Sequence, residues 1–375
     1  MKITIIQGAF FPVPPIMGGA VEKLWYGLGR EFARAGHEVT HISRRHLELP
    51  DQENNGGVNY LRVKGEHSTN NIPLLKLRDF FYTRRVLPLL PQADILISNT
   101  FWLPLLLSDP SRGKVIISVE RMPKGQMRFY GRASIFRACS TVVADAVRAE
   151  LLPEDKRVRM IPNPLPHRVE SSIHLSRKQP IILYVGRIHP KKGIELLLRA
   201  AMNLPSPWKV VIVGPHDEAR GGGGEAYLEK LKSMVGKATV EFRGPIFNDE
   251  KLISFYEEAS LFAYPSVDGA GEAMPIAPLE AMAQGCVPIV SALDCFADFV
   301  SDGVNGLVFD HHASDPVAAL HEEIARLCSD PALRERLALR AMEVRHSHSL
   351  GGIAEKFLHL FSGIVSMKFK DSISE

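Results

Sequence analysis

The chain has 375 residues, enough for about two ordinary domains with sizeable cores. Apolar residues make up 45% and charged residues 23%, which excludes a wholly disordered chain, a fibrous repeat and a disulfide scaffold. The four cysteines lack metal-ligand spacing, so we expect reduced thiols in a cytoplasmic protein. We expect no nucleic-acid partner. The apolar start, MKITIIQG, predicts a buried strand rather than a signal peptide. No apolar run approaches the roughly 20 residues that span a bilayer.

The net charge of +3 is unevenly distributed along the chain. Residues 1–170 hold 24 Lys and Arg against 16 Asp and Glu, which gives +8. The remaining residues hold 21 against 26, which gives −5. A basic first half and an acidic second half indicate two domains with different partners. The alternative is a drift in surface charge without functional meaning.

Short β-branched runs alternate with helical patterns along the first half of the chain. Between Gly19 and Gly36, apolar residues recur at helical spacing, and the second glycine ends the helix. Continuous apolar strands bounded by helices predict a parallel sheet covered on both faces. The expected strands are 2–7, 38–43, 58–63, 93–98, 114–119 and 140–145.

The same pattern restarts after the Pro-, Ser- and Asn-rich segment 161–180, which we interpret as an interdomain linker. The glycine run at 221–224 is expected to form a flexible surface loop. Two βαβ arrays predict an α/β fold of two doubly wound, Rossmann-like domains, with a cleft at the carboxyl ends of their strands. The expected strands are 180–186, 208–214, 239–244, 261–266, 287–292 and 305–310, and the expected helices are about 193–203, 225–236, 249–259, 276–284 and 315–329.

Two cations follow the strand at 180–186. Arg187 and Lys192 lie in the segment G-R-I-H-P-K-K-G, just before an expected helix. Ligands of doubly wound domains bind outside the carboxyl ends of the strands. Two cations beside the positive end of a helix therefore predict a site for a diphosphate. The alternative is a solvated basic loop.

A second cluster lies in residues 271–285, where two prolines place the start of a helix. The free N–H groups of Ile276 and Ala277 are predicted to hold phosphate oxygens. Glu272 and Glu280 are predicted to accept hydrogen bonds from sugar hydroxyls. An acidic helix start that merely favours the helix dipole would explain Glu272 well and the deeper Glu280 poorly.

A third candidate is the glycine pair Gly18 and Gly19, between the first strand and the first helix. Paired glycines let a ligand approach the backbone closely. The loop is not the G-x-G-x-x-G fingerprint, so it gives little support to NAD binding.

Together these features resemble the retaining glycosyltransferases of family 4, which have the two-domain GT-B fold. The resemblance rests on the N-terminal glycine pair, on G-R-x-x-x-K-K-G, on E-x7-E followed by A-M-A-x-G, and on the downstream segment SDGVNGLVFD. It implies two Rossmann-like domains, 1–165 for the acceptor and 166–350 for the nucleotide sugar. A C-terminal segment, 351–375, would form a helix that crosses back to the first domain.

The resemblance also implies an activity. The enzyme would move a hexose-type sugar, with retention, from a UDP- or GDP-type sugar donor to a sugar, a lipid-linked or a small-molecule acceptor. Glycan, glycolipid or cell-envelope polysaccharide biosynthesis is the expected setting, with no cofactor and no metal. The alternatives are a nucleotide-sugar epimerase or phosphorylase on the same fold, and a non-catalytic nucleotide-sugar-binding relative.

The family's roles transfer to the matching residues here. Two departures from its pattern stand out: Ala273 replaces a frequent glycine, and Glu120 stands where many members have a histidine. Glu120 could equally be a strand-end carboxylate paired with Arg121. By the resemblance, Arg187 and Lys192 would neutralise the leaving diphosphate. Glu272 would contact the transferred sugar, and Glu280 would contact the ribose. Gly18 and Gly19 would contact the donor phosphates or the acceptor, and the backbone at Pro245 and Ile246 would contact the base.

Residues 73–91 interleave basic, leucine and phenylalanine residues. Such a mixture suits the surface of an anionic membrane, so peripheral contact with the cytoplasmic face is one hypothesis. The alternative is a helix whose apolar stripe packs in the core and whose arginines are solvated.

Overall fold

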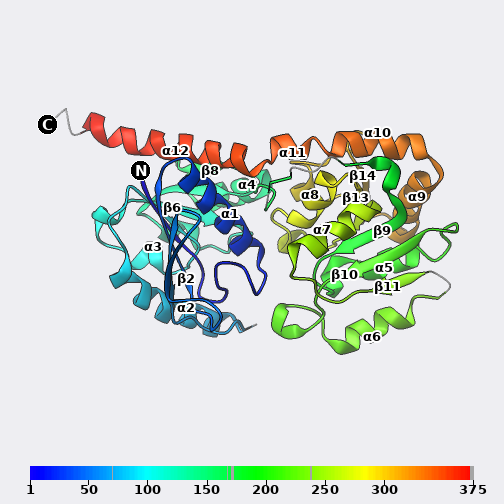
Figure 1. Cartoon of the computed structure of the whole chain (residues 1–375), viewed down its shortest axis with the longest axis horizontal. Helices are drawn as coiled ribbons and strands as arrows, with labels where there is room; N and C mark the ends of the chain where they lie inside the picture. Colours follow the sequence, from blue (N-terminus) through cyan, green and yellow to red (C-terminus); the bar gives the residue numbers. More distant parts are fainter. Residues whose placement is uncertain (70, 167, 170–172, 237–238, 372–375) are drawn as a thin grey trace. The chain divides into compact units, whose positions relative to one another are not determined.

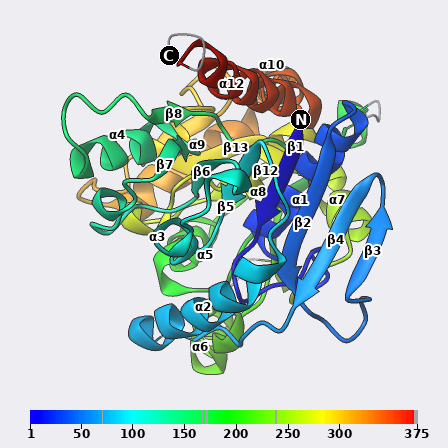
Figure 2. The ribbon, with the colours of Figure 1, turned by 90° about the vertical axis from the view of Figure 1, so that its left-hand side faces the viewer.

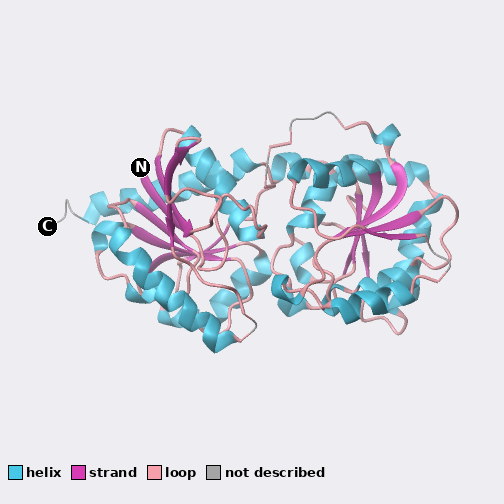
Figure 3. Ribbon diagram, turned by 60° about the horizontal axis from the view of Figure 1, so that its bottom comes forward, coloured by secondary structure: helices cyan, strands magenta, loops and turns pink. Residues whose placement is uncertain are grey.

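The computed structural model describes residues 1–69, 71–166, 168–169, 173–236 and 239–371. The chain divides into two compact units: unit 1 comprises Met1–Arg168 and His348–Glu375, and unit 2 comprises Val169–Ser347. The division after Arg168 falls inside the segment 161–180, of which residues 167 and 170–172 lie outside the described residues. In each unit, helices cover both faces of one sheet (Figure 3).

Over the described part of unit 1, the sheet has eight strands in the order β3-β4-β2-β1-β5-β6-β7-β8. All neighbours are parallel except β3 and β4, which form an antiparallel pair at one edge (Figure 2). The central strand β1 is buried from its second residue onward, as expected of a strand covered on both faces. The strands are β1 (Lys2–Ile6), β2 (Glu38–Arg44), β3 (Gln52–Asn55), β4 (Val58–Val63), β5 (Ile95–Ser98), β6 (Lys114–Val119), β7 (Ala133–Ala138) and β8 (Val158–Met160).

The helices of unit 1 include the last helix of the chain, α12 (Leu350–Asp371), which lies along α1 (Ala20–Arg34) (Figure 1). Aromatic rings form this contact. The ring centroids of Trp25 and Phe357 are 5.4 Å apart, and those of Phe32 and Phe361 are 5.6 Å apart. The remaining helices are α2 (Ile72–Val86), the short α3 (Leu103–Leu106) and α4 (Thr141–Glu150).

Unit 2 has a parallel sheet of six strands within its described residues, in the order β11-β10-β9-β12-β13-β14. The strands are β9 (Gln179–Val185), β10 (Lys209–Val213), β11 (Val240–Phe242), β12 (Ala259–Tyr264), β13 (Val287–Ser291) and β14 (Leu307–Phe309). The helices are α5 (Ile194–Ala200), α6 (Glu225–Ser233), α7 (Asp249–Glu258), α8 (Ile276–Ala283), α9 (Pro316–Ser329), α10 (Pro331–Ala341) and α11 (Val344–Ser347).

The structure confirms the expected strands of unit 2 and all but one of those expected in the first half. The exception is 140–145, which is wrong because these residues begin α4. The Ser140 hydroxyl accepts a hydrogen bond from the backbone N–H of Val143 and so caps the helix. Three strands were not expected from the sequence: the polar β3, the short β8, and β7, whose buried Arg137 interrupts the apolar pattern.

Among the described residues, no helix is both long enough and apolar enough to cross a membrane.

Candidate functional site

The strand order of the unit 2 sheet reverses between β9 and β12, and we call this position the switch point of the sheet. Of the described strands of this unit, β9 comes first in the chain and β12 fourth, yet they are neighbours in the sheet. Chain connections leave in opposite directions from such a point, and their loops leave room for a ligand at the carboxyl ends of the strands. The loops that follow β9 and β12 contain Arg187, Lys192 and Glu272, so the structure brings these three predicted residues to one edge of the sheet.

Lys192 is buried and held by two side chains from the β12 side of the site. Its ammonium donates a hydrogen bond to the Tyr264 hydroxyl at 3.0 Å and forms an ion pair with Glu272. The side chains of Lys192 and Glu272 are only 10% and 5% exposed, so each charge depends on the other for solvation. The structure brings these two predicted residues together, and one oxygen of Glu272 binds Lys192.

Gly193 allows this close approach of the two loops. Its φ of +67° lies in the left-handed region, where a side chain would be strained. A Cβ atom at this position would lie 1.8 Å from the carbonyl oxygen of Pro265. The backbone also joins the loops, because the Val267 N–H donates to the Lys191 carbonyl at 3.0 Å.

Two stacked tyrosines lie next to the ion pair, and the Lys192 ammonium is 5.2 Å from the centre of the Tyr264 ring. The rings of Tyr184, on β9, and Tyr264, on β12, are 5.8 Å apart and nearly parallel. Burial raises the pKa of both phenols well above the ordinary value, so both hydroxyls stay protonated at neutral pH. Neither tyrosine could be singled out from the sequence, because each lies within an apolar strand pattern and resembles a core residue.

Arg187 differs from Lys192 in being exposed. Its guanidinium donates a hydrogen bond to the Gly221 carbonyl at 3.1 Å. The glycine run 221–224 therefore packs on this segment rather than forming a free loop, and the Gly223 N–H also donates to the Ile188 carbonyl at 2.8 Å. A Cβ atom at Gly222 would lie 2.1 Å from the His216 carbonyl oxygen, which explains a glycine there.

Helix α8 provides the remaining predicted contacts. Ile276 and Ala277 are its first two residues, and no side chain caps the helix, so their N–H groups are available to an anion. Glu280 lies on the same helix and accepts a hydrogen bond from the Tyr256 hydroxyl at 2.9 Å. This bond fixes one carboxylate oxygen of a side chain that is half-buried.

Ile246 follows β11 and is half-buried. The preceding Gly244 accepts a hydrogen bond from the Gly214 N–H at 2.9 Å, which ties this loop to the end of β10. On the other side, the guanidinium of Arg220 lies 4.8 Å from the centre of the exposed Phe247 ring. The loop that contains Ile246 thus contacts the segment around Arg220 and Gly221, whose carbonyl accepts the hydrogen bond from Arg187.

In unit 1, Gly18 and Gly19 precede α1 and both have positive φ angles, of 78° and 105°. A Cβ atom at Gly19 would lie 2.2 Å from a carboxylate oxygen of Glu22. Glu22 is buried in the first turn of α1, and this burial raises its pKa to about 7, although the charge of Arg121 acts in the opposite direction. The positive φ angle is therefore the main reason for a glycine at position 19, because the end of the flexible Glu22 side chain could move aside.

Glu120 lies at the end of β6 and forms a buried ion pair with Arg137 on the neighbouring strand β7. The Ser118 hydroxyl donates to Glu120 at 2.6 Å, and Arg137 also donates to Asn163 at 2.7 Å. The carboxylate is thus part of a buried network, and its ion pair is with Arg137 rather than Arg121.

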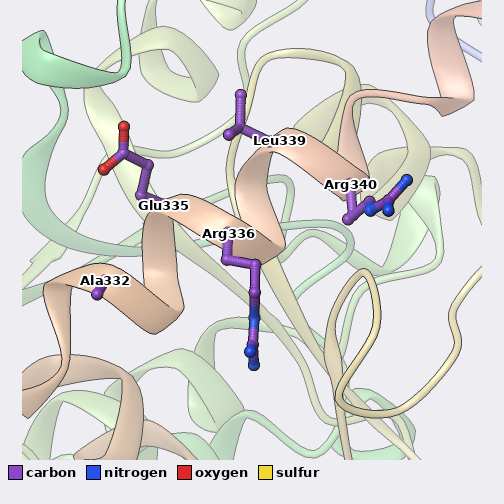
Figure 4. A pocket seen from close by; sticks show the side chains of 5 residues that line it. All are labelled: Ala332, Glu335, Arg336, Leu339 and Arg340. Carbon is purple, nitrogen blue, oxygen red and sulfur yellow. The ribbon is translucent and has the colours of Figure 1, made fainter.

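A surface hollow of about 350 Å³ lies on the outside of α10 (Figure 4). Its lining residues are Ala332, Glu335, Arg336, Leu339 and Arg340, none of which belongs to the predicted site. Across the described chain, no three His, Cys, Asp or Glu side chains gather where they could hold a metal ion.

Because the Lys192–Glu272 ion pair is buried and the Lys191–Asp268 pair is not, breaking the first should destabilise the fold much more than breaking the second. Glu272→Ala leaves a buried ammonium unpaired, so we expect it to lower the free energy of unfolding by about 3–5 kcal/mol. Lys191 forms an ion pair with Asp268 but is itself 65% exposed, so Lys191→Ala should cost less than about 1 kcal/mol. Urea unfolding of both variants checks this. If Glu272→Ala lowered the free energy of unfolding as little as Lys191→Ala is expected to, the Lys192–Glu272 ion pair would not be needed for folding.

The raised pKa of Glu22 predicts a pH-dependent stability. The folded chain binds the Glu22 proton more tightly than an unfolded chain, whose glutamates titrate near the ordinary value of 4.5. The free energy of unfolding should therefore fall as the pH rises from 4.5 to 7. Glu22→Gln removes this loss, so the variant should match the wild type at pH 4 and exceed it by roughly 3 kcal/mol at pH 8.

Thermal and urea unfolding across this pH range measure the effect. Glu48→Gln, at an exposed site, is the control and should leave the profile unchanged. If stability depended on pH in the same way in Glu22→Gln as in the wild type, the raised pKa of the buried Glu22 carboxyl would be contradicted.

Residues 169–344 match the family described as Glycosyl transferases group 1. The D-inositol 3-phosphate glycosyltransferase of Nocardiopsis dassonvillei is 26% identical over an alignment of 284 positions, and the match covers 69% of this chain and 64% of that protein. An uncharacterized glycosyltransferase of Methanocaldococcus jannaschii is 26% identical over an alignment of 406 positions, and the match covers 98% of this chain and 99% of that protein. The chain therefore spans less than two thirds of the first relative and nearly all of the second.

Solved structures are similar over both units. The sucrose-phosphate synthase of Thermosynechococcus elongatus has a TM-score of 0.79 at 19% identity, covering 98% of this chain and 100% of that one. Anabaena HepE, solved in complex with UDP and glucose, has a TM-score of 0.71 at 16% identity, covering 97% and 100%. At these identities the likeness shows the fold. The chain thus has the GT-B fold, and its residues 169–344 are similar to the glycosyl transferases group 1.

Proposed function

We propose that this chain transfers a hexose-type sugar from a nucleoside-diphosphate sugar to an acceptor, with retention of configuration. The observation that carries the proposal is the meeting of Arg187, Lys192 and Glu272 at the switch point of the unit 2 sheet, beside α8. Cations and free N–H groups at one sheet edge suit a diphosphate, and carboxylates suit sugar hydroxyls. The family match of unit 2 supports the same reaction class.

The leaving diphosphate gains negative charge as the glycosidic bond breaks, so groups that stabilise this charge accelerate the reaction. Arg187 is exposed and can move onto the diphosphate, and its bond to the Gly221 carbonyl holds it near the edge of the sheet. Lys192 is already fixed by Glu272 and Tyr264, so its ammonium needs little reorganisation. We propose that these two cations neutralise the leaving group without a divalent metal.

Glu272 has two tasks in this proposal. One oxygen positions Lys192, and the other is left for a hydroxyl of the transferred sugar. Glu280 accepts a ribose hydroxyl while Tyr256 holds its second oxygen, and the backbone at Ile246 contacts the base. A UDP- or GDP-type donor is proposed. The complex of HepE with UDP and glucose supports uridine as the first base to test.

The acceptor is assigned to unit 1, with Gly18, Gly19 and Glu120 among the candidate contacts. Glu120 binds Arg137 within a buried network, so we propose that it holds the end of β6 in place rather than taking a proton from the acceptor. The names of the similar proteins, which include a lipopolysaccharide 1,2-N-acetylglucosaminetransferase of Salmonella typhimurium, support glycan, glycolipid or cell-envelope polysaccharide biosynthesis. Cytoplasmic transfer to a sugar, lipid-linked or small-molecule acceptor is consistent with that setting.

The role of Arg187 predicts a change in turnover rather than in substrate binding. Arg187→Ala should lower kcat about a hundredfold or more, because one donor to the developing charge is lost, and KM should change much less. The assay is the release of UDP or GDP from a panel of hexose donors in EDTA, with glycan and glycolipid acceptors. Product anomeric configuration by NMR tests retention.

Lys191→Ala is the matched control, because Lys191 is an exposed cation of the same segment whose ion pair is with Asp268. It should keep the wild-type kcat. Equal activity of Arg187→Ala and Lys191→Ala would remove Arg187 from the mechanism. Complete loss of wild-type activity in EDTA, restored by Mn²⁺, would contradict neutralisation by side chains alone.

A further inference from the structure

Helix α2 (Ile72–Val86) buries several polar side chains and exposes several apolar ones. Asp79, Tyr82 and Thr83 are buried against unit 1. Leu74, Leu77 and Phe81 are 38%, 50% and 48% exposed. The ordinary surface helix has the opposite arrangement. The expectation that the apolar stripe of this segment packs in the core is therefore wrong for these three residues.

The orientation of α2 is fixed by hydrogen bonds on its buried side. The Asp79 carboxylate accepts from the backbone N–H groups of Phe101 and Trp102, at 2.9 and 3.2 Å. The Trp102 indole N–H donates to the Lys76 carbonyl at 2.7 Å. A rotation of the helix that buried the leucines would break these bonds and leave Asp79 without its donors. The apolar stripe is thus held on the outside.

The three apolar residues form one continuous stripe, because positions 74, 77 and 81 are spaced by three and four residues. Figure 2 shows α2 on the outside of unit 1. We call Leu74, Leu77, Phe81 and the exposed Arg84 the α2 face. Arg84 lies three residues after Phe81, so its guanidinium extends from the same side of the helix.

Basic side chains lie beside this stripe. Arg78 and Arg85 lie on the same helix, half-buried, and Arg85 forms an ion pair with Glu66. Arg84 also lines a surface hollow of about 520 Å³ together with Arg112 and the apolar side chains of Leu87 and Leu106. Asp109 is the acidic residue of this lining and already forms an ion pair with Arg112. The surface is therefore apolar in its centre and cationic at its edge.

We propose that the α2 face docks on the surface of an anionic lipid bilayer. Phe81 and the two leucines would enter the boundary between headgroups and acyl chains, while Arg84 pairs with a lipid phosphate. Charge decides among the occupants: a second copy of this face would bring like charges together, whereas an anionic leaflet complements the +8 of residues 1–170. The docking does not depend on the proposed reaction and can be tested without it.

The test is flotation of the full chain with vesicles of phosphatidylcholine alone or with phosphatidylglycerol, at low and high salt. We expect flotation with the anionic vesicles, weakened by salt. Arg84→Glu should lower the partition coefficient about fivefold or more, and Phe81→Ser about tenfold or more. The two changes address the charge and the apolar contact separately.

The matched control uses α10, where Leu339 is 54% exposed and Arg336 lies three residues before it (Figure 4). Leu339→Ser and Arg336→Glu should leave flotation unchanged. Circular dichroism verifies that all four variants are folded. The proposal is overturned if the wild type does not float with anionic vesicles, or if the α2 and α10 variants float alike. It is also overturned if the wild type is a dimer in solution that Phe81→Ser converts to a monomer.

Discussion

The buried pair of Lys192 and Glu272 joins the two loops on which the candidate site depends. One charge comes from the loop after β9 and the other from the loop after β12, and the Lys192 ammonium lies over the ring of Tyr264. Two charges removed from water stabilise each other only with good geometry and further hydrogen bonds, which Tyr264 provides. The same pairing that keeps the loops together therefore keeps a cation at the switch point of the sheet before any ligand arrives.

Local sequence pattern was enough to predict most of the strands of both sheets. Apolar β-branched runs such as 2–7 and 287–292 are buried strands here, as expected. The same preference misled at 140–145, where Ser140 caps a helix that begins with β-branched residues. The buried Arg137 concealed β7, because its partners Glu120 and Asn163 are distant in sequence.

The partners of the site residues depend on tertiary structure and could not be predicted. Arg187 and Lys192 look equivalent in the sequence, yet one is exposed and the other is buried. The same holds for α2, whose composition does not show which face is turned inward. Its orientation follows from Asp79, whose donors lie on a segment more than 20 residues away along the chain. Hydrogen bonds between distant segments thus decide what each surface can bind.

The central claim is that a nucleoside diphosphate binds at the switch point of unit 2. Hydrogen–deuterium exchange with and without saturating UDP or GDP tests it most directly. We expect bound nucleotide to slow the exchange of the amides in 186–193 and at the start of α8, with no such change in α10. Nucleotide binding that leaves both segments unprotected, or that protects other residues instead, would contradict it.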